Sequence, residues 1–283
     1  MVKNTLKTTA LLAGLGALFM AVGSAFGGRG GLTIGLVLGI VMVGGSYWFS
    51  DKLAIRSAGA TEASETDAPQ LYAMVRELTT RAEMPMPRIY ISPNQQPNAF
   101  ATGRNERHAA VAVTQGLMQV LDHDELKGVL AHEISHIRHR DILTSSVAAA
   151  VAMGITFAAR MAMWGAIFGG GNSRDDEGQN PFAAIAMMIL APIAAMMLQM
   201  ALSRSREFEA DRGGAELCGT GQGLASALRK IEGYAHRVPM DINPAQASAY
   251  IVNPLTGRTM QFAKLFSTHP ATEDRIARLQ QFG

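Results

Sequence analysis

Two long uncharged stretches near the start of the chain restrict its possible folds more than any other feature. Residues 8–28 and 30–50 contain no Asp, Glu, Lys or Arg. Each holds about 21 residues, which as a helix spans roughly 31 Å and so crosses the hydrocarbon core of a bilayer. A secretory signal also has a basic start and an apolar run, but here the second stretch follows at once without a convincing cleavage site. We therefore expect residues 1–50 to form an N-terminal transmembrane hairpin.

A second pair of apolar stretches lies in the middle of the chain. Residues 142–159 are uncharged, Arg160 follows, and a further apolar run ends at Phe168, while residues 181–202 are uncharged and rich in Met and Ala. Two buried core helices are the alternative interpretation. If the first stretch crosses outward, Arg160 lies near its far end, where a long side chain can reach the interface. We expect residues 142–202 to form a second transmembrane hairpin, which gives four spans in total.

The composition and the basic residues indicate a mainly α-helical membrane protein with both termini in the cytoplasm. Hydrophobic residues make up 48% of the chain and charged residues only 17%, below the quarter that is usual for soluble domains. Basic residues gather on the cytoplasmic side of membrane proteins. One side here carries Lys3, Lys7, Lys52, Arg56, Arg138, Arg140, Arg204, Arg206 and Arg212, and the other carries Arg29, Arg160 and Arg174. The single cysteine suits a reducing compartment. The sequence has no cluster of basic and aromatic residues of the kind that binds nucleic acid.

The run from His132 to His136, His-Glu-Ile-Ser-His, is the part of the chain that indicates chemistry. It lies in residues 125–140, where apolar positions recur at helical spacing, and Asp122 fits a capped helix start. Two histidines four residues apart lie on one helix face and can bind a single zinc ion. Glu133 then lies beside the water that the zinc activates and can act as a general base. Because chance matches to this motif occur on ordinary solvated helices, a matching second motif is needed.

A catalytic zinc site needs a third protein ligand. One known pattern places a histidine six residues after the second one, but that position is Ile142. His139 is better explained as a solvated or phosphate-facing residue than as a ligand. Glu207 and Asp211 lie four residues apart on a predicted helix, so Glu207 can complete the site while Asp211 orients a ligand histidine. A charged surface helix would explain this segment alone, but the two motifs together predict one zinc ion per chain.

Residues 51–141 and 203–283 remain for a cytoplasmic α+β domain with a small sheet. About 170 residues can bury a sizeable core. Hydrophobic patterns and turn residues predict helices at residues 65–82, 125–140, 210–234 (with a break at 219–223) and 272–282, and strands at 87–92, 98–103 and 108–114. An exposed edge of this sheet could pair with an extended peptide, although an ordinary structural hairpin is the simpler explanation of these strands.

Taken together, these segments make the chain similar to a known family. It resembles the HtpX-type bacterial membrane metalloproteases, relatives of the eukaryotic CAAX prenyl proteases. The resemblance covers almost the whole chain, including both hydrophobic hairpins and the motifs at residues 98–103, 131–136, 206–211 and 267–270. It implies a zincin-like metalloprotease domain in which His132, His136 and Glu207 bind zinc and Glu133 is the catalytic base.

The resemblance also implies roles that spacing alone could not show. Asn98, Ala99 and Phe100 would form a substrate edge strand beside the cleft, and His269 and Arg275 would line the site opposite the zinc. The family degrades misfolded or damaged membrane proteins in the bacterial inner membrane, often under stress. Its implied partners are therefore unfolded or membrane-protein substrates, the lipid bilayer and other quality-control components.

Two other functions remain open at this point. A membrane zinc-binding scaffold or regulator without proteolytic activity would need the histidines but not Glu133. A transporter or channel would place ionisable residues within its spans, facing a pathway, whereas here only Arg160 lies in one.

Overall fold

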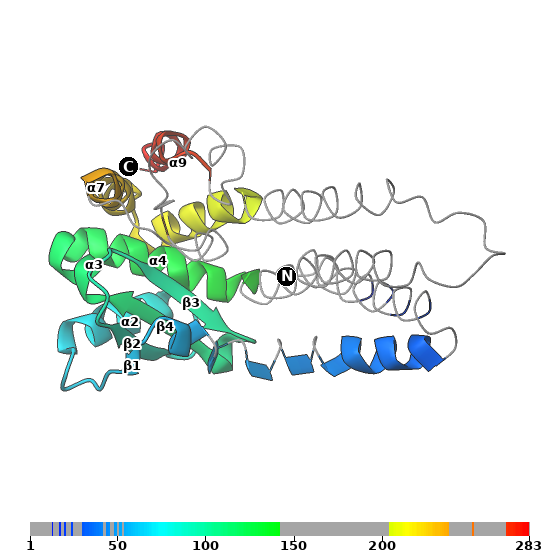
Figure 1. The fold of residues 1–283 in the computed structure, drawn as a ribbon. Helices are drawn as coiled ribbons and strands as arrows, with labels where there is room; N and C mark the ends of the chain where they lie inside the picture. The colour runs from blue at the N-terminus through cyan, green and yellow to red at the C-terminus, as the bar shows by residue number, and fades with distance from the viewer. Residues whose placement is uncertain are drawn as a thin grey trace. The chain divides into compact units, whose positions relative to one another are not determined.

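The structure of the protein is a computed structural model of the 283-residue chain. It describes residues 54–141, 204–237, 251 and 270–282, together with residues 30–41 and isolated positions between 13 and 52. The chain divides into two compact units, Met1–Trp48 with Thr144–Gln199 and Phe49–Leu143 with Met200–Gly283. All the elements labelled in Figure 1 belong to the second unit.

The two predicted membrane hairpins lie mostly outside the residues that the structure describes. The stretches at 142–168 and 181–202 lie outside the described residues, as does most of 8–28. Residues 30–41 are helical. Among the helices that the structure describes, none is both long enough and apolar enough to cross a bilayer. The four spans and their orientation therefore remain predictions.

The described sheet has four strands, and the inner strand β4 contributes residues to the core on both of its faces. The strands are β1 (Thr61–Glu62), β2 (Arg88–Ser92), β3 (Ala99–Gly103) and β4 (Ala109–Thr114), in the order β1-β2-β4-β3. β2 and β4 are parallel, while β1 and β3 pair antiparallel with their neighbours. Every residue of β4 is buried, because strands lie on both sides of it and side chains pack against both of its faces. β3 lies at one edge of the sheet, as the resemblance implied.

The two faces of β4 pack into different clusters, because successive strand residues point to opposite faces. Val111 and Val113 join the large core cluster that also contains apolar residues of the helices. Ala110 and Ala112 join Tyr90 in a small cluster on the other face. The helices therefore cover the valine face of the sheet.

The helix that carries the histidine pair has the cap at Asp122 that the sequence predicted, and both of its ends lie two residues earlier than expected. Helix α4 spans His123–Arg138. The Asp122 side chain accepts hydrogen bonds from the Asp124 and Glu125 N–H groups, and the Glu125 carboxylate accepts one from the Asp122 N–H. This reciprocal capping satisfies N–H groups that the first turn leaves unpaired. In Figure 1, α4 lies along the sheet next to β3, which it contacts directly.

The remaining helices confirm most of the predicted elements, with shifted ends. They are α2 (Pro69–Arg81), α3 (Gln115–Val120), an unlabelled helix over residues 204–218, α7 (Gln222–Arg237) and α9 (Thr272–Leu279). Gly219 has a positive φ of 79°, which ends one helix before α7 begins and confirms the predicted break. β1 and α3 were not predicted, because both are too short to show a period.

Two glycines let helices approach α4 more closely than a side chain would allow. A Cβ on Gly128 of α4 would lie 2.5 Å from the Leu224 backbone nitrogen of α7. A Cβ on Gly214 would lie 2.9 Å from the His132 backbone nitrogen. Both distances are below the contact of real Cβ atoms. The absence of a side chain at Gly214 thus allows the 204–218 helix to lie directly against α4 at its first histidine.

Candidate metal centre

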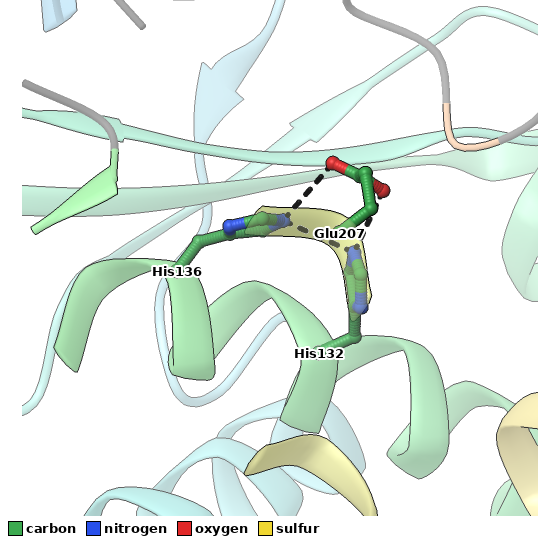
Figure 2. A group of neighbouring side chains, drawn as sticks. All are labelled: His132, His136 and Glu207. Atoms are coloured by element: carbon green, nitrogen blue, oxygen red, sulfur yellow. Dashed lines mark hydrogen bonds and ion pairs between the residues drawn. The ribbon is translucent and has the colours of Figure 1, made fainter. Parts of the chain in front are cut away.

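Three side chains from two distant segments converge above α4 (Figure 2). The Nε2 atoms of His132 and His136 are 3.1 Å apart. Glu207 places Oε2 3.6 Å from the first of these nitrogens and Oε1 3.5 Å from the second. Ligands on a tetrahedral zinc ion, with metal–ligand bonds of about 2.0–2.1 Å, lie roughly 3.3 Å apart. The three side chains are therefore spaced as ligands of one small cation, and they could hold a metal ion.

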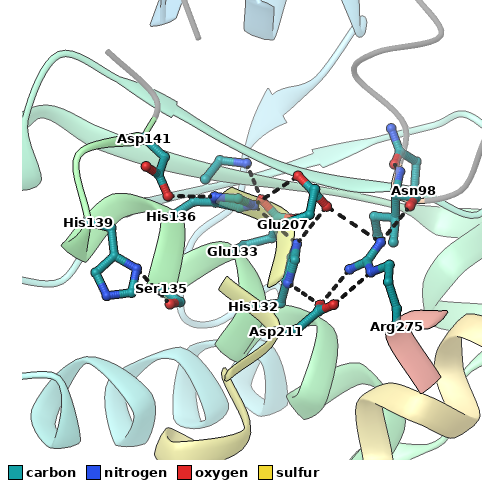
Figure 3. Close-up of polar contacts among 12 residues, drawn as sticks. Asn98, His132, Glu133, Ser135, His136, His139, Asp141, Glu207, Asp211 and Arg275 are labelled. Atoms are coloured by element: carbon teal, nitrogen blue, oxygen red, sulfur yellow. Dashed lines mark hydrogen bonds and ion pairs between the residues drawn. The ribbon is translucent and has the colours of Figure 1, made fainter. Parts of the chain in front are cut away.

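The far nitrogen of each imidazole faces a carboxylate (Figure 3). His132 Nδ1 lies 2.9 Å from Asp211 Oδ1, and His136 Nδ1 lies 3.2 Å from Asp141 Oδ2. These contacts favour the proton on Nδ1, which leaves a lone pair on each Nε2. Two lone pairs and the Glu207 carboxylate then point at one another, an arrangement that repels unless a cation lies between them. The chemistry of this donor set fits a zinc ion.

The electrostatics of the site favour positive charge at the same point. Burial alone would lower the pKa of His136, but hydrogen bonds to Asp141 and Glu207 and the charges of Glu207 and Glu133 raise that pKa to about 10. The carboxylates around this imidazole are themselves buried. The negative charge of these carboxylates favours a cation where the two Nε2 atoms and Glu207 meet.

Arg275 lies behind the candidate ligands and is completely buried, with 1% of its surface exposed. Its Nε and Nη2 donate to the two carboxylate oxygens of Asp211, at 2.9 and 2.7 Å. Its Nη1 lies 3.5 Å from Glu207 Oε2. Burial would raise the pKa of Asp211, but the charge of Arg275 and the contact with His132 lower it to about 2. Arg275 thus fixes the carboxylate that orients His132 and also borders Glu207.

Glu133 links the zinc-motif helix to the edge of the sheet. Its carboxylate is buried, and Oε2 accepts a hydrogen bond of 2.8 Å from the Ala101 N–H of β3. Ala101 pairs with Val111 in the antiparallel ladder between β3 and β4. The Ala101 N–H nevertheless points away from β4 and toward α4, where it meets Glu133. The general-base candidate therefore lies directly beside the outer edge of β3.

The other predicted site residues fall in different places. Asn98 is buried and lies immediately before β3, whose first two residues are Ala99 and Phe100. The Phe100 side chain packs against the small cluster around Tyr90. His139 lies beyond the end of α4, where its Nδ1 is 3.3 Å from Ser135 Oγ, and it is not in the three-residue metal group. His269 lies outside the described residues.

Asp141 is the polar residue of the site that sequence reasoning missed. It is buried, 1% exposed, and follows the end of α4 at the position where the chain turns back toward His136. Arg140, just before it, has a positive φ of 59°, and this turn has no sequence signal comparable to a glycine. The rule that a ligand histidine needs a carboxylate on its second nitrogen could have prompted a search for it.

Comparison with known proteins connects this geometry to a family. The sequence model of peptidase family M48 matches residues 65–282, a range that includes every residue of the candidate centre. The chain belongs to peptidase family M48. With protease relatives that match along its whole length, it is a metalloprotease.

Two of the relatives show how far the similarity extends. A protease HtpX homolog of Burkholderia thailandensis is 53% identical over 283 residues, covering 98% of this chain and 96% of its own. A protease HtpX homolog of Paraburkholderia phytofirmans is also 53% identical, with the same coverage. The predicted resemblance to HtpX-type M48 proteases is therefore confirmed.

A solved structure supports the fold. The crystal structure of Ste24p from S. mikatae matches with a TM-score of 0.59 and 18% sequence identity, covering 98% of this chain. The chain spans 66% of the length of that protein. At this identity the match concerns the fold: an M48 metalloprotease domain with a small mixed sheet packed against helices.

Proposed function

We propose that this M48 protease is an integral-membrane, zinc-dependent endopeptidase. His132, His136 and Glu207 would hold one zinc ion per chain, and Glu133 would be the general base. The observation that carries the proposal is the spacing of three metal-binding atoms, 3.1–3.6 Å apart, with both imidazoles turned by carboxylates on their far side.

The reaction divides between the metal and the side chains of the chain. When bound, zinc would lower the pKa of a water molecule and polarise the peptide carbonyl. Glu133 would take the proton from the attacking water and deliver it to the leaving amine. The Ala101 N–H holds one oxygen of that carboxylate, so the other oxygen is oriented for proton transfer. His269 stays a candidate for stabilising the oxyanion, while the buried contacts of Arg275 favour a positioning role over contact with the reacting atoms.

The outer edge of β3 is the proposed substrate track. An extended polypeptide that pairs with an open strand edge is held by its main chain, independent of sequence. The strand that begins after Asn98 passes Glu133 at Ala101, so a substrate on Asn98, Ala99 and Phe100 would run past the base. This track suits unfolded polypeptides.

The membrane setting and the substrates follow from the apolar stretches and the relatives. Several apolar side chains in residues 30–41 are exposed, and Ile34, Ile40 and Val41 each have 63% of their surface accessible. Exposed aliphatic side chains on a helix suit a lipid environment. We propose four spans, a cytoplasmic protease domain, a bacterial inner-membrane location, and misfolded or damaged membrane proteins as substrates, with a role under stress.

A zinc-binding scaffold without turnover is the alternative. Such a protein would have no need of a buried carboxylate aligned by the Ala101 N–H beside the metal group. The position of Glu133 therefore favours the protease.

Substitution Glu133→Gln tests the proposal directly. The amide cannot accept the proton, so cleavage of an unfolded substrate in detergent should fall by about 10²–10⁴-fold or more. Bound zinc, measured by metal analysis, should stay at the wild-type level because Glu133 is not a ligand. Glu209→Gln, an exposed glutamate on the 204–218 helix, is the matched control and should keep full activity. Normal cleavage by Glu133→Gln would remove Glu133 as the base.

A further inference from the structure

Ile251 lies against the candidate centre, and the site itself holds its main chain. Its N–H donates a 3.1 Å hydrogen bond to Asn98 Oδ1. Its carbonyl accepts a 3.1 Å hydrogen bond from Arg275 Nη1. Its side chain is buried, 4% exposed, within the large core cluster. Both backbone groups of one residue are thus held by side chains that come from distant parts of the chain.

The two holders belong to the site. Arg275 Nη1, the atom that binds the Ile251 carbonyl, is also 3.5 Å from Glu207 Oε2. Asn98 immediately precedes the edge strand whose Ala101 N–H holds Glu133. Figure 3 shows Asn98 and Arg275 on the same side of Glu207. An amide acceptor and a guanidinium donor, spaced to take one N–H and one C=O, recognise a peptide main chain of any sequence.

We propose that Ile251 is an internal pseudosubstrate, whose main chain fills a position that the backbone of a substrate takes during cleavage. The inference rests on the proposed endopeptidase function and adds a substrate contact and a restraint to it. Asn98 and Arg275 hold the substrate main chain, and the buried Ile251 side chain marks an adjoining position that prefers a large aliphatic residue. A substrate must first displace Ile251.

The physical consequence is a reduced apparent affinity for polypeptides. A ligand that binds only the vacated fraction of a site shows a dissociation constant raised by the inverse of that fraction. A tethered occupant competes at a high effective concentration, because the chain connects it to the site. Weakening the hold on Ile251 should therefore tighten binding of an external peptide, whereas removal of a purely structural anchor should not.

Peptide binding to the full-length, zinc-loaded Glu133→Gln protein tests this without turnover. The probe is a fluorescent nine-residue peptide with the sequence of residues 247–255, Ala-Ser-Ala-Tyr-Ile-Val-Asn-Pro-Leu. Adding Ile251→Asp should lower the dissociation constant about tenfold, as expected when a site is released from roughly nine-tenths occupancy. Ile251→Val, which keeps shape and both hydrogen bonds, is the control and should bind like the parent. A probe with Asp in place of Ile should bind weakly to all of them.

Two further variants make every outcome decisive. Ile251→Ala carries the same test if the aspartate variant does not fold. Adding Asn98→Ala to it should weaken the probe again, because the acceptor for the substrate N–H is lost. An affinity that stays unchanged or falls in both Ile251 variants, together with a lower melting temperature, would make Ile251 a structural anchor and overturn the proposal. Because binding is read without cleavage, failure of the endopeptidase function would appear separately, as wild-type protein that binds the probe and cuts nothing.

Discussion

The two helices that meet at the candidate metal centre reach it in different ways. On α4 the three functional residues His132, Glu133 and His136 follow from one local pattern, and the helix period alone places both imidazoles on one face. The helix over residues 204–218 supplies Glu207 and Asp211, but its place depends on contacts made elsewhere. Helix geometry thus decides which atoms can point together, and tertiary packing decides whether they meet.

Those distant contacts are identifiable. Gly214 lets the 204–218 helix lie against the backbone of His132. Arg275 of α9 then binds Asp211 with two hydrogen bonds and borders Glu207. The position of the 204–218 helix therefore depends on contacts with α4 on one side and with α9 on the other. Because substitutions at either contact can displace Glu207 and Asp211, we expect this half of the centre to be more easily disrupted than α4. The predictions below test this difference.

The largest expected effect is on metal retention in Glu207→Ala. The two histidines remain on α4, but the only carboxylate of the three-residue group is gone. Catalytic zinc sites use three protein ligands, so bound zinc after purification should drop to near background and activity should be lost. Glu209→Ala on the same helix is the control and should bind zinc normally. Full zinc content in Glu207→Ala would mean that another residue completes the site.

Asp211→Asn should have the next largest effect, because it leaves the buried charge of Arg275 without its partner. Breaking a buried ion pair from one side costs about 3–5 kcal/mol of folding stability. Metal affinity should also fall by about 10–100-fold, since the orientation of His132 is lost. Chemical denaturation and metal competition measure the two effects. Removing both partners, in Asp211→Asn with Arg275→Leu, should restore part of the stability but none of the metal affinity.

The stability effect at Asp211 has a definite pH dependence. The pKa of this carboxyl is lowered from 3.8 to about 2, so its ionised form is stabilised by folding. Its contribution is complete above about pH 3.8 and is lost as the pH falls through about 2. The stability difference between wild type and Asp211→Asn should therefore shrink between pH 4 and pH 2, two values that flank this window. A difference that stays constant over that range would argue against the lowered pKa.

The same contrast explains how far the sequence could predict the structure. Helix α4, its cap at Asp122 and the histidine pair follow from local patterns and are found as expected. The edge strand and the break at Gly219 also follow from local patterns. Asp141 was missed because a turn without a glycine brings it back to His136, and the contacts of Arg275 with Asp211 and Glu207 could not be read from a local pattern. Contacts of this kind depend on packing between segments far apart, which no periodic pattern encodes.

Gly214→Ala tests the packing itself. An alanine is better than glycine within a helix by about 0.5–1 kcal/mol. Its Cβ would meet the His132 backbone, and overpacking of this kind costs about 1–3 kcal/mol. The second effect should win, so the melting temperature should fall and zinc should be held less tightly as the helix moves away. Glu216→Ala, an exposed substitution two residues further on, should change neither.

Asp141→Asn should have the smallest effect and so sharpens the comparison between the two imidazoles. Both histidines have a carboxylate on Nδ1, but the two carboxylates differ in their own support. Asp211 accepts two hydrogen bonds from the completely buried Arg275, whereas Asp141 follows the end of α4 on the same local segment as its histidine and acts on the buried Arg206 through its charge. We expect Asp141→Asn to weaken zinc binding by about tenfold, the lower end of the range for such partners, with less loss of stability than Asp211→Asn. Metal competition and denaturation on the two variants side by side measure this order. The reverse order would place the main constraint on the α4 side of the centre and would contradict the view that the distant helix is the more vulnerable half.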